Sequence, residues 1–137
     1  MLQTLPLLTI SLAIFVVLSL FTGEPAAPWY TLPSMDFELI SGDVWRVSRG
    51  DVFLAFSMVL LFVEILRATK SGSASVMNHA FSVVVFIIAL LMFLTTRGYG
   101  NSTFFLFTSM TLLDFMAGFI ITTVTARRDL SLGRTDI

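Results

Sequence analysis

The chain has 137 residues, of which 56% are hydrophobic and only 12% are charged. Soluble domains place charge on about a quarter of their residues, so this composition excludes an ordinary water-soluble fold and predicts a membrane protein. A net charge of −1 argues against a general nucleic-acid-binding surface. The absence of cysteine excludes disulfides, thiolate metal sites and cysteine nucleophiles.

Four apolar runs follow one another along the chain, and each has the length of a helix. They predict an all-α polytopic membrane protein, a bundle of four transmembrane helices that forms a single domain over residues 1–137. The first run is expected to stay in the mature protein and not to be cleaved as a signal peptide, because no basic residue precedes it. The expected helices cover residues 4–22, 51–68, 79–96 and 103–126.

The basic residues predict an orientation. Three of them lie on the side of the long 23–50 loop, where acidic residues outnumber the loop's two arginines, and five lie on the opposite side. Segments rich in Lys and Arg stay in the cytoplasm, so we expect both termini to be cytoplasmic. The five are Arg67, Lys70, Arg127, Arg128 and Arg134.

The outer loop, residues 23–50, is the largest region expected outside the membrane. Trp29, Tyr30 and Trp45 are predicted interface anchors, because amphipathic rings concentrate among lipid headgroups. Residues 37–47 partly alternate around a Ser-Gly-Asp turn, which fits a short hairpin or an interfacial helical turn, and the pattern does not separate these two. We expect this loop to lie on the bilayer.

The two remaining links differ in kind. Residues 70–75 have the composition of a flexible linker, and Asn78 is a predicted N-cap for the third helix. Residues 97–102 form a tight turn, which predicts that the third and fourth helices are antiparallel neighbours.

Asp114 is the first candidate for a functional residue, because a carboxylate near the bilayer centre costs about 2.5 to 3.5 kcal/mol on insertion scales. Helical spacing places small and hydroxyl residues on its face, which predicts a polar stripe turned into the bundle. One interpretation is packing by interhelical hydrogen bonds, and the other is a proton or ion site. The stripe comprises Thr108, Thr111, Gly118, Thr122 and Thr125.

Glu64 is the second carboxylate within a predicted span. Arg67 lies three residues further along the same helix, so a local ion pair is one expectation. The alternative places Glu64 opposite His79, where the two could relay protons because histidine titrates near neutral pH.

No catalytic constellation emerges, and we expect no enzyme, no metal site and no resident cofactor. A single histidine cannot supply both axial ligands of a haem, and no histidine–carboxylate pair accompanies a serine where a triad would need it. The apolar faces leave a bound lipid, quinone or pigment as an open alternative.

Several short motifs carry a resemblance. The sequence resembles small four-helix bacterial inner-membrane proteins of no assigned function, which implies that architecture and a bacterial inner membrane, and no active site. The motifs are residues 64–70, Asn78-His79, Phe104-Phe105, Asp114 with Gly118, and residues 126–129.

The leading functional hypothesis is an accessory or scaffolding subunit that contacts membrane lipids and either a membrane-protein partner or further copies of itself. The alternative is a small oligomeric proton- or cation-coupled transporter or channel that uses Asp114 and Glu64. A third hypothesis, a sensor that binds a ligand through the aromatic outer loop, rests on Trp29, Tyr30 and Trp45.

Overall fold

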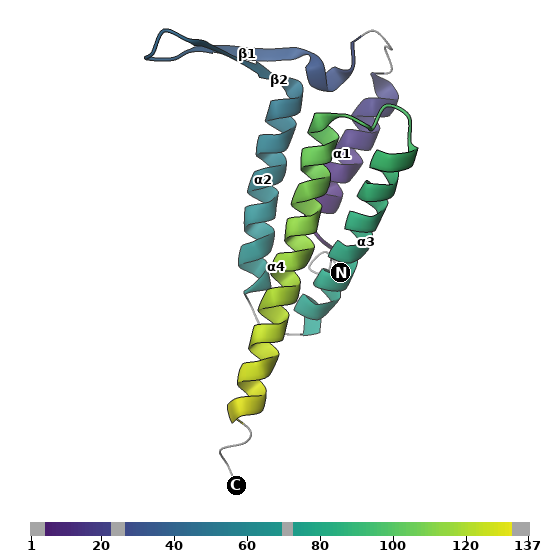
Figure 1. Ribbon diagram of the computed structural model, residues 1–137, viewed down its shortest axis with the longest axis vertical. Helices are drawn as coiled ribbons and strands as arrows, with labels where there is room; N and C mark the ends of the chain where they lie inside the picture. Colours follow the sequence, from purple (N-terminus) through teal and green to yellow (C-terminus); the bar gives the residue numbers. More distant parts are fainter. Residues whose placement is uncertain (1–4, 23–26, 70–72, 133–137) are drawn as a thin grey trace.

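The computed structural model describes residues 5–22, 27–69 and 73–132, and most of them are helical (Figure 1). Four helices lie side by side, and a two-stranded hairpin projects sideways from one end. Apart from this hairpin the predicted all-α class is confirmed. The elements are α1 (Leu8–Phe21), the 3-10 turn η1 (Trp29–Thr31), β1 (Pro33–Glu38), β2 (Val44–Ser48), α2 (Arg49–Ala68), α3 (Ser73–Thr95) and α4 (Ser102–Leu132).

The helices form a closed ring. α4 packs against both α2 and α3, and α1 packs against the same two helices. The α3–α4 turn is short, as expected, and Gly98 adopts a positive φ of 91° there, a conformation that glycine takes without strain. We call the end that holds this turn and the hairpin the outer end, and the end where α2 passes into α3 the inner end.

Two of the helices, α3 and α4, are long and apolar enough to cross a membrane, over Met77–Thr95 and Ser102–Arg128. The 14 residues of α1 make a helix of about 21 Å, which is shorter than the hydrocarbon core of about 30 Å. The 20 residues of α2 reach about 30 Å, but this helix carries four charged residues. Within the described residues, length and composition therefore support the membrane prediction directly for two helices.

Three predicted helix boundaries were wrong. α1 begins at Leu8 and not at residue 4, because Pro6 has no backbone N–H and disfavours a helical conformation at Leu5. α3 begins at Ser73, so Asn78 lies inside the helix and does not cap it, and residues 73–75 belong to the helix and not to a linker; residues 70–72 lie outside the described residues. α4 continues to Leu132 instead of stopping at 126, because Ala126 and the arginines that follow are good helix formers and no glycine or proline occurs before Gly133.

The core changes character along the bundle. Its outer half is aromatic, and the fully buried ring of Phe15 lies at its centre. The ring centroids of Trp29, Phe53 and Phe104 lie 5.1, 5.3 and 4.7 Å from that of Phe15. Trp29 is only 4% exposed and donates its Nε1–H to Ser19 Oγ at 3.1 Å, so its ring belongs to this core. The inner half holds the two buried carboxylates, Glu64 and Asp114.

The segment left open between a hairpin and a helical turn is an antiparallel hairpin. Phe37 pairs with Trp45, and Asp36 pairs with Arg46. Because successive side chains in a strand point to opposite faces, Phe37, Trp45 and Val47 share one face, and Asp36 and Arg46 share the other. Val47 is buried where the hairpin meets the rest of the molecule, so the apolar face is turned to the side of the helices.

Candidate functional site

Five polar side chains meet in the inner half of the bundle, and all of them are buried. We call this group the buried polar cluster. α2 supplies one of its members, α3 three and α4 one, so the cluster links the helices that surround it. Its members are Glu64, Asn78, His79, Ser82 and Asp114.

Glu64 has the most partners of the five. Its Oε2 accepts a hydrogen bond of 2.7 Å from the backbone N–H of Leu7 and lies 3.5 Å from an Arg67 guanidinium nitrogen. Its Oε1 accepts a hydrogen bond from the Asn78 amide. The ion pair with Arg67 expected from the helical spacing is therefore present. The carboxylate also joins α2 to α3 and to the segment that leads into α1.

Glu64 also interacts favourably with the dipole of α1. That helix has no side-chain cap and no acidic residue in its first turn. The first N–H groups of a helix lack partners within the helix, and its N-terminus carries a partial positive charge. Glu64 supplies both a hydrogen-bond acceptor and a negative charge at this point from another helix.

Asp114 makes the second connection between helices. Its Oδ2 accepts a hydrogen bond of 2.7 Å from the Ser82 hydroxyl, which joins α4 to α3. Glu64 interacts electrostatically with Asp114 and also with His79. The two carboxylates that the sequence singled out, Glu64 and Asp114, thus belong to one electrostatic group.

The hydroxyls on the Asp114 face behave differently from the carboxylate. Thr108, Thr111 and Asp114 are buried, as the spacing indicated, and Thr122 is partly buried. The threonine hydroxyls donate to carbonyls of α4 itself: Thr108 to Phe104 at 2.9 Å, Thr111 to Thr108 at 2.7 Å and Thr122 to Gly118 at 2.8 Å. Among the described side chains of this stripe, only that of Asp114 makes a hydrogen bond to another helix. The Thr125 side chain is not among those that the structure describes.

His79 packs against Gly118. A Cβ built on Gly118 would lie 2.1 Å from His79 Nδ1, so the imidazole occupies the space that any side chain at 118 would need. Small residues permit such close approach of neighbouring helices. The Asn78 amide donates a hydrogen bond to Glu64, and the His79 ring contacts α4 at Gly118.

Sequence reasoning missed Asn78, Ser82 and the Leu7 N–H. Asn78 and Ser82 are four residues apart, so within a helix their side chains lie on the same face. Both lie inside α3 because that helix begins at Ser73, earlier than predicted. The backbone N–H of Leu7 leaves no sequence signal, because every residue except proline has one.

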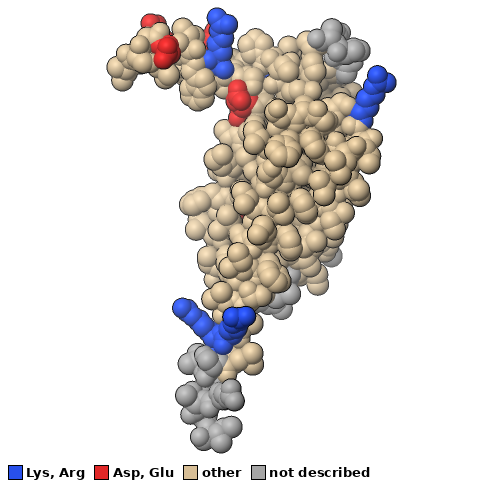
Figure 2. Space-filling model, in the orientation of Figure 1, with Lys and Arg blue, Asp and Glu red and all other residues tan. Residues whose placement is uncertain are grey.

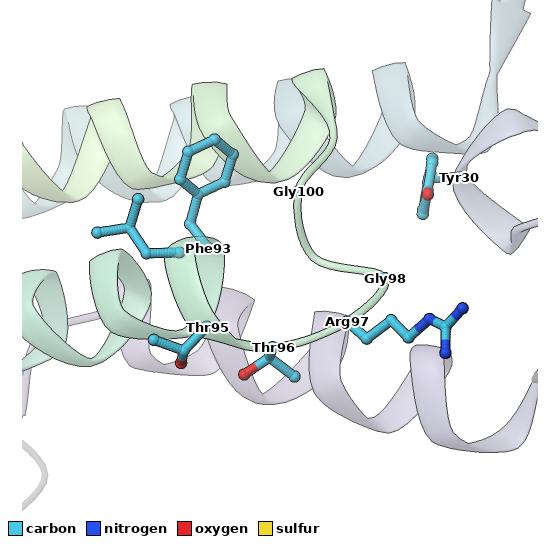
Figure 3. A pocket seen from close by; sticks show the side chains of 8 residues that line it. Tyr30, Phe93, Thr95, Thr96, Arg97, Gly98 and Gly100 are labelled. Carbon is cyan, nitrogen blue, oxygen red and sulfur yellow. The ribbon is translucent and has the colours of Figure 1, made fainter.

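Two shallow hollows of about 440 and 710 Å³ lie at the outer end, opposite to the buried polar cluster. Both are lined by Tyr30, Thr96, Arg97 and Gly98. Figure 3 shows the smaller one, where Tyr30 faces the α3–α4 turn and the Arg97 side chain extends along the rim. Among the described residues, Arg97 has no ion-pair partner.

No model of a known protein family, no curated protein and no solved structure matches the chain.

Proposed function

We propose that this protein is a four-span integral membrane protein that serves as a non-enzymatic accessory or scaffolding subunit. In this proposal it contacts the other subunits of a larger membrane assembly, or further copies of itself, through the outer faces of its helices. Its location is the bacterial inner membrane, with both termini in the cytoplasm.

The distribution of polar and apolar side chains supports the membrane embedding. In a water-soluble bundle the apolar side chains face inward and the charged ones face water. Here Glu64 is 1% exposed and Asp114 4%, whereas Phe62 of α2 is 62% exposed. Figure 2 shows the same order on one face of the molecule, where charged side chains gather at the two ends and the middle is free of them.

The arrangement of the helices supports four spans. α1 and α2 lie alongside α3 and α4 in one bundle (Figure 1), so a bilayer crossed by α3 and α4 also surrounds the other two. The exposed faces of α1 and α2 are apolar, with Val17, Phe56 and Met58 among them. The four charged residues of α2 are compatible with a membrane span. Arg49 and Asp51 lie in its first turn, and Glu64 is buried beside Arg67.

The single observation that carries the accessory role is that groups of the same chain bind the two buried carboxylates. The carboxylates of Glu64 and Asp114 accept their hydrogen bonds from Leu7, Asn78 and Ser82 of the same chain. Such a bundle offers large apolar faces for contacts within the membrane, where helices associate by packing.

Native mass spectrometry of the protein, extracted in mild detergent from its own membrane, tests this role. We expect a companion protein, or further copies of the chain, at a fixed stoichiometry. Recovery of a single chain with only lipid attached would contradict the accessory role.

A second function is favoured by one specific observation, the burial of two carboxylates and an imidazole in one electrostatic group. We also propose, as the competing function, a small oligomeric proton- or cation-coupled transporter or channel that uses Asp114 and Glu64. Four helices per chain would require a dimer or a larger ring to enclose a path. Proton and cation flux in liposomes should then fall in the Asp114→Asn variant, and unchanged flux would exclude this function.

A further inference from the structure

An apolar groove of about 330 Å³ runs between α1 and α2 in the outer half of the bundle. One wall consists of Ile14 and Leu18 from α1, and the other of Val52, Phe53 and Phe56 from α2. Thr22 and Trp29 complete the lining toward the outer end. The groove is separate from the buried polar cluster and has no part in the functions proposed above.

Arg49 is the charged residue that lines this groove. It is the first residue of α2, and its backbone N–H donates to the Leu32 carbonyl at 2.9 Å, which fixes its position. Its side chain is exposed and has no hydrogen bond or ion pair with the described residues. Asp51, the acidic residue nearest to it in α2, accepts hydrogen bonds from the backbone N–H and the hydroxyl of Ser48.

The polar and apolar parts of the groove are ordered along the helix axes. At 1.5 Å per residue, Phe56 lies about 10 Å inward from Arg49 along α2. Ile14 lies about 12 Å inward from Thr22 along α1. A basic group therefore stands at the outer end, and an apolar channel leads from it toward the middle of the bundle.

This order matches that of a phospholipid in a bilayer, with its phosphate at the surface and its acyl tails below. We propose that the groove binds one phospholipid, with an acyl tail between α1 and α2 and the phosphate on the Arg49 guanidinium. A guanidinium presents several N–H donors in a plane that suits phosphate oxygens. The inference rests on the membrane embedding of the proposed function, and not on the accessory role.

Binding of two lipids to the purified full chain tests the two halves of the site. Dioleoylphosphatidylglycerol has both the tails and the phosphate, whereas dioleoylglycerol has the same tails without phosphate. Native mass spectrometry of the detergent-solubilised protein measures how much of each lipid it retains. We expect the phospholipid to bind about tenfold more tightly, the effect of a charge-assisted hydrogen-bonded pair.

Arg49→Gln should abolish this preference for the phospholipid. The matched control is Arg97→Gln, which removes an outer-end arginine that also lacks an ion-pair partner among the described residues but does not line the groove. Equal losses in the two variants would overturn the site, because they would mean that any outer arginine attracts headgroups.

Leu18→Trp should fill the groove and weaken binding of both lipids about tenfold. Leu113→Trp places the same ring on the exposed face of α4 and should leave binding unchanged. Val52→Trp fills the groove from the other wall and replaces Leu18→Trp if that variant does not fold. Unchanged lipid binding in a folded groove-filling variant would show that the acyl tail does not bind in this groove.

Carbonate extraction of the membranes separates this inference from the proposed function. A chain released into the soluble fraction would contradict the membrane embedding itself. A chain that stays in the membrane but retains phospholipid independently of Arg49 would overturn the lipid site alone.

Discussion

Glu64 stabilises the start of a helix to which it does not belong. Its carboxylate accepts the Leu7 N–H at the beginning of α1 while it also binds Asn78 and Arg67. A buried carboxylate is costly by itself, and removing one partner of a buried group leaves the others without compensation. At this residue, the structural role and the candidate proton role depend on the same charge.

Glu64→Ala should therefore destabilise the bundle by about 3–5 kcal/mol, because the Leu7 N–H, the Asn78 amide and the Arg67 guanidinium all lose an acceptor. Glu64→Gln keeps the shape and one acceptor oxygen and should cost only about 1–2 kcal/mol. Denaturant titration in detergent measures both changes. Glu38→Ala, on the exposed hairpin, is the control and should have little effect; similar losses for the two Glu64 variants would mean that the hydrogen bonds contribute little.

Gly118 is required by the ring that packs on it. Gly118→Ala should destabilise the protein by about 1–3 kcal/mol, because the added Cβ would overlap His79 at 2.1 Å. Gly100→Ala makes the same chemical change where the nearest atom is 3.9 Å away, and it should be tolerated.

A second substitution tests the cause of this loss. If steric overlap is responsible, His79→Ala should recover most of the stability lost in Gly118→Ala when the two are combined in a double-mutant cycle. Additive losses would show that the glycine matters for another reason.

Among the elements, the start of α2 has its own source of stability. Ser48 and Asp51 form a capping box, in which the Asp51 N–H donates to Ser48 Oγ at 3.1 Å and the Ser48 N–H donates to Asp51 Oδ2 at 2.8 Å. The hydrogen bonds from Ser48 hold the pKa of Asp51 below its usual value of 3.8. The box thus fixes the point at which the hairpin passes into the helix.

Ser48→Ala should cost about 1 kcal/mol at neutral pH. A lowered folded-state pKa means that the contribution of Asp51 is complete above about pH 4, where the unfolded chain is also deprotonated. It is lost as the pH falls through the lowered pKa. The cost of Ser48→Ala, measured by thermal unfolding in detergent, should therefore shrink in strong acid; Asp36→Asn is the control, and an equal cost at both pH values would contradict the role of the carboxylate.

The hairpin has two unlike faces, and its pairing register predicts which one meets lipid. Trp45 shares its face with Val47, on the side of the helices, and Arg46 is on the opposite face. With Trp29 replaced by Phe, Trp45 fluorescence should be quenched by lipids brominated near the headgroup. Moving the tryptophan by one residue, as Trp45→Phe with Arg46→Trp, should remove most of the quenching, whereas equal quenching at both positions would mean that the hairpin does not lie flat.

Much of the architecture followed from patterns in the sequence, and the failures have a common cause. Apolar runs and the short turn before Ser102 predicted the helices and the antiparallel pairing of α3 and α4, because hydropathy and turn length are local properties. Asparagine favours helix caps, which is why the sequence predicts a cap at Asn78, yet its amide donates to Glu64 on another helix. Contacts with other helices cannot be predicted from the residue type at a single position. The hydrogen bond from the Leu7 N–H and the packing of His79 on Gly118 are further examples.

For the whole molecule, the two halves of the core differ in how they hold the helices together. The outer half packs aromatic rings around Phe15, and the inner half joins helices by hydrogen bonds to two carboxylates. In a membrane the apolar effect between helices is weak, because lipid tails are also apolar, so packing and hydrogen bonds carry the association. The inner half therefore gives the bundle specific contacts that lipid cannot replace.

Because the chain contains no cysteine, single-cysteine variants can count how often it crosses the membrane. In intact cells a membrane-impermeant maleimide should label Ser41→Cys in the hairpin turn, whereas Gln3→Cys and Leu130→Cys should react only after permeabilisation. Phe62→Cys lies in the middle of α2, on its exposed face, and should stay unlabelled in both cases because lipid surrounds it. Four spans require all three results together: labelling of Phe62→Cys from water would place α2 outside the bilayer, and labelling of Gln3→Cys from the outside would mean that α1 does not cross it.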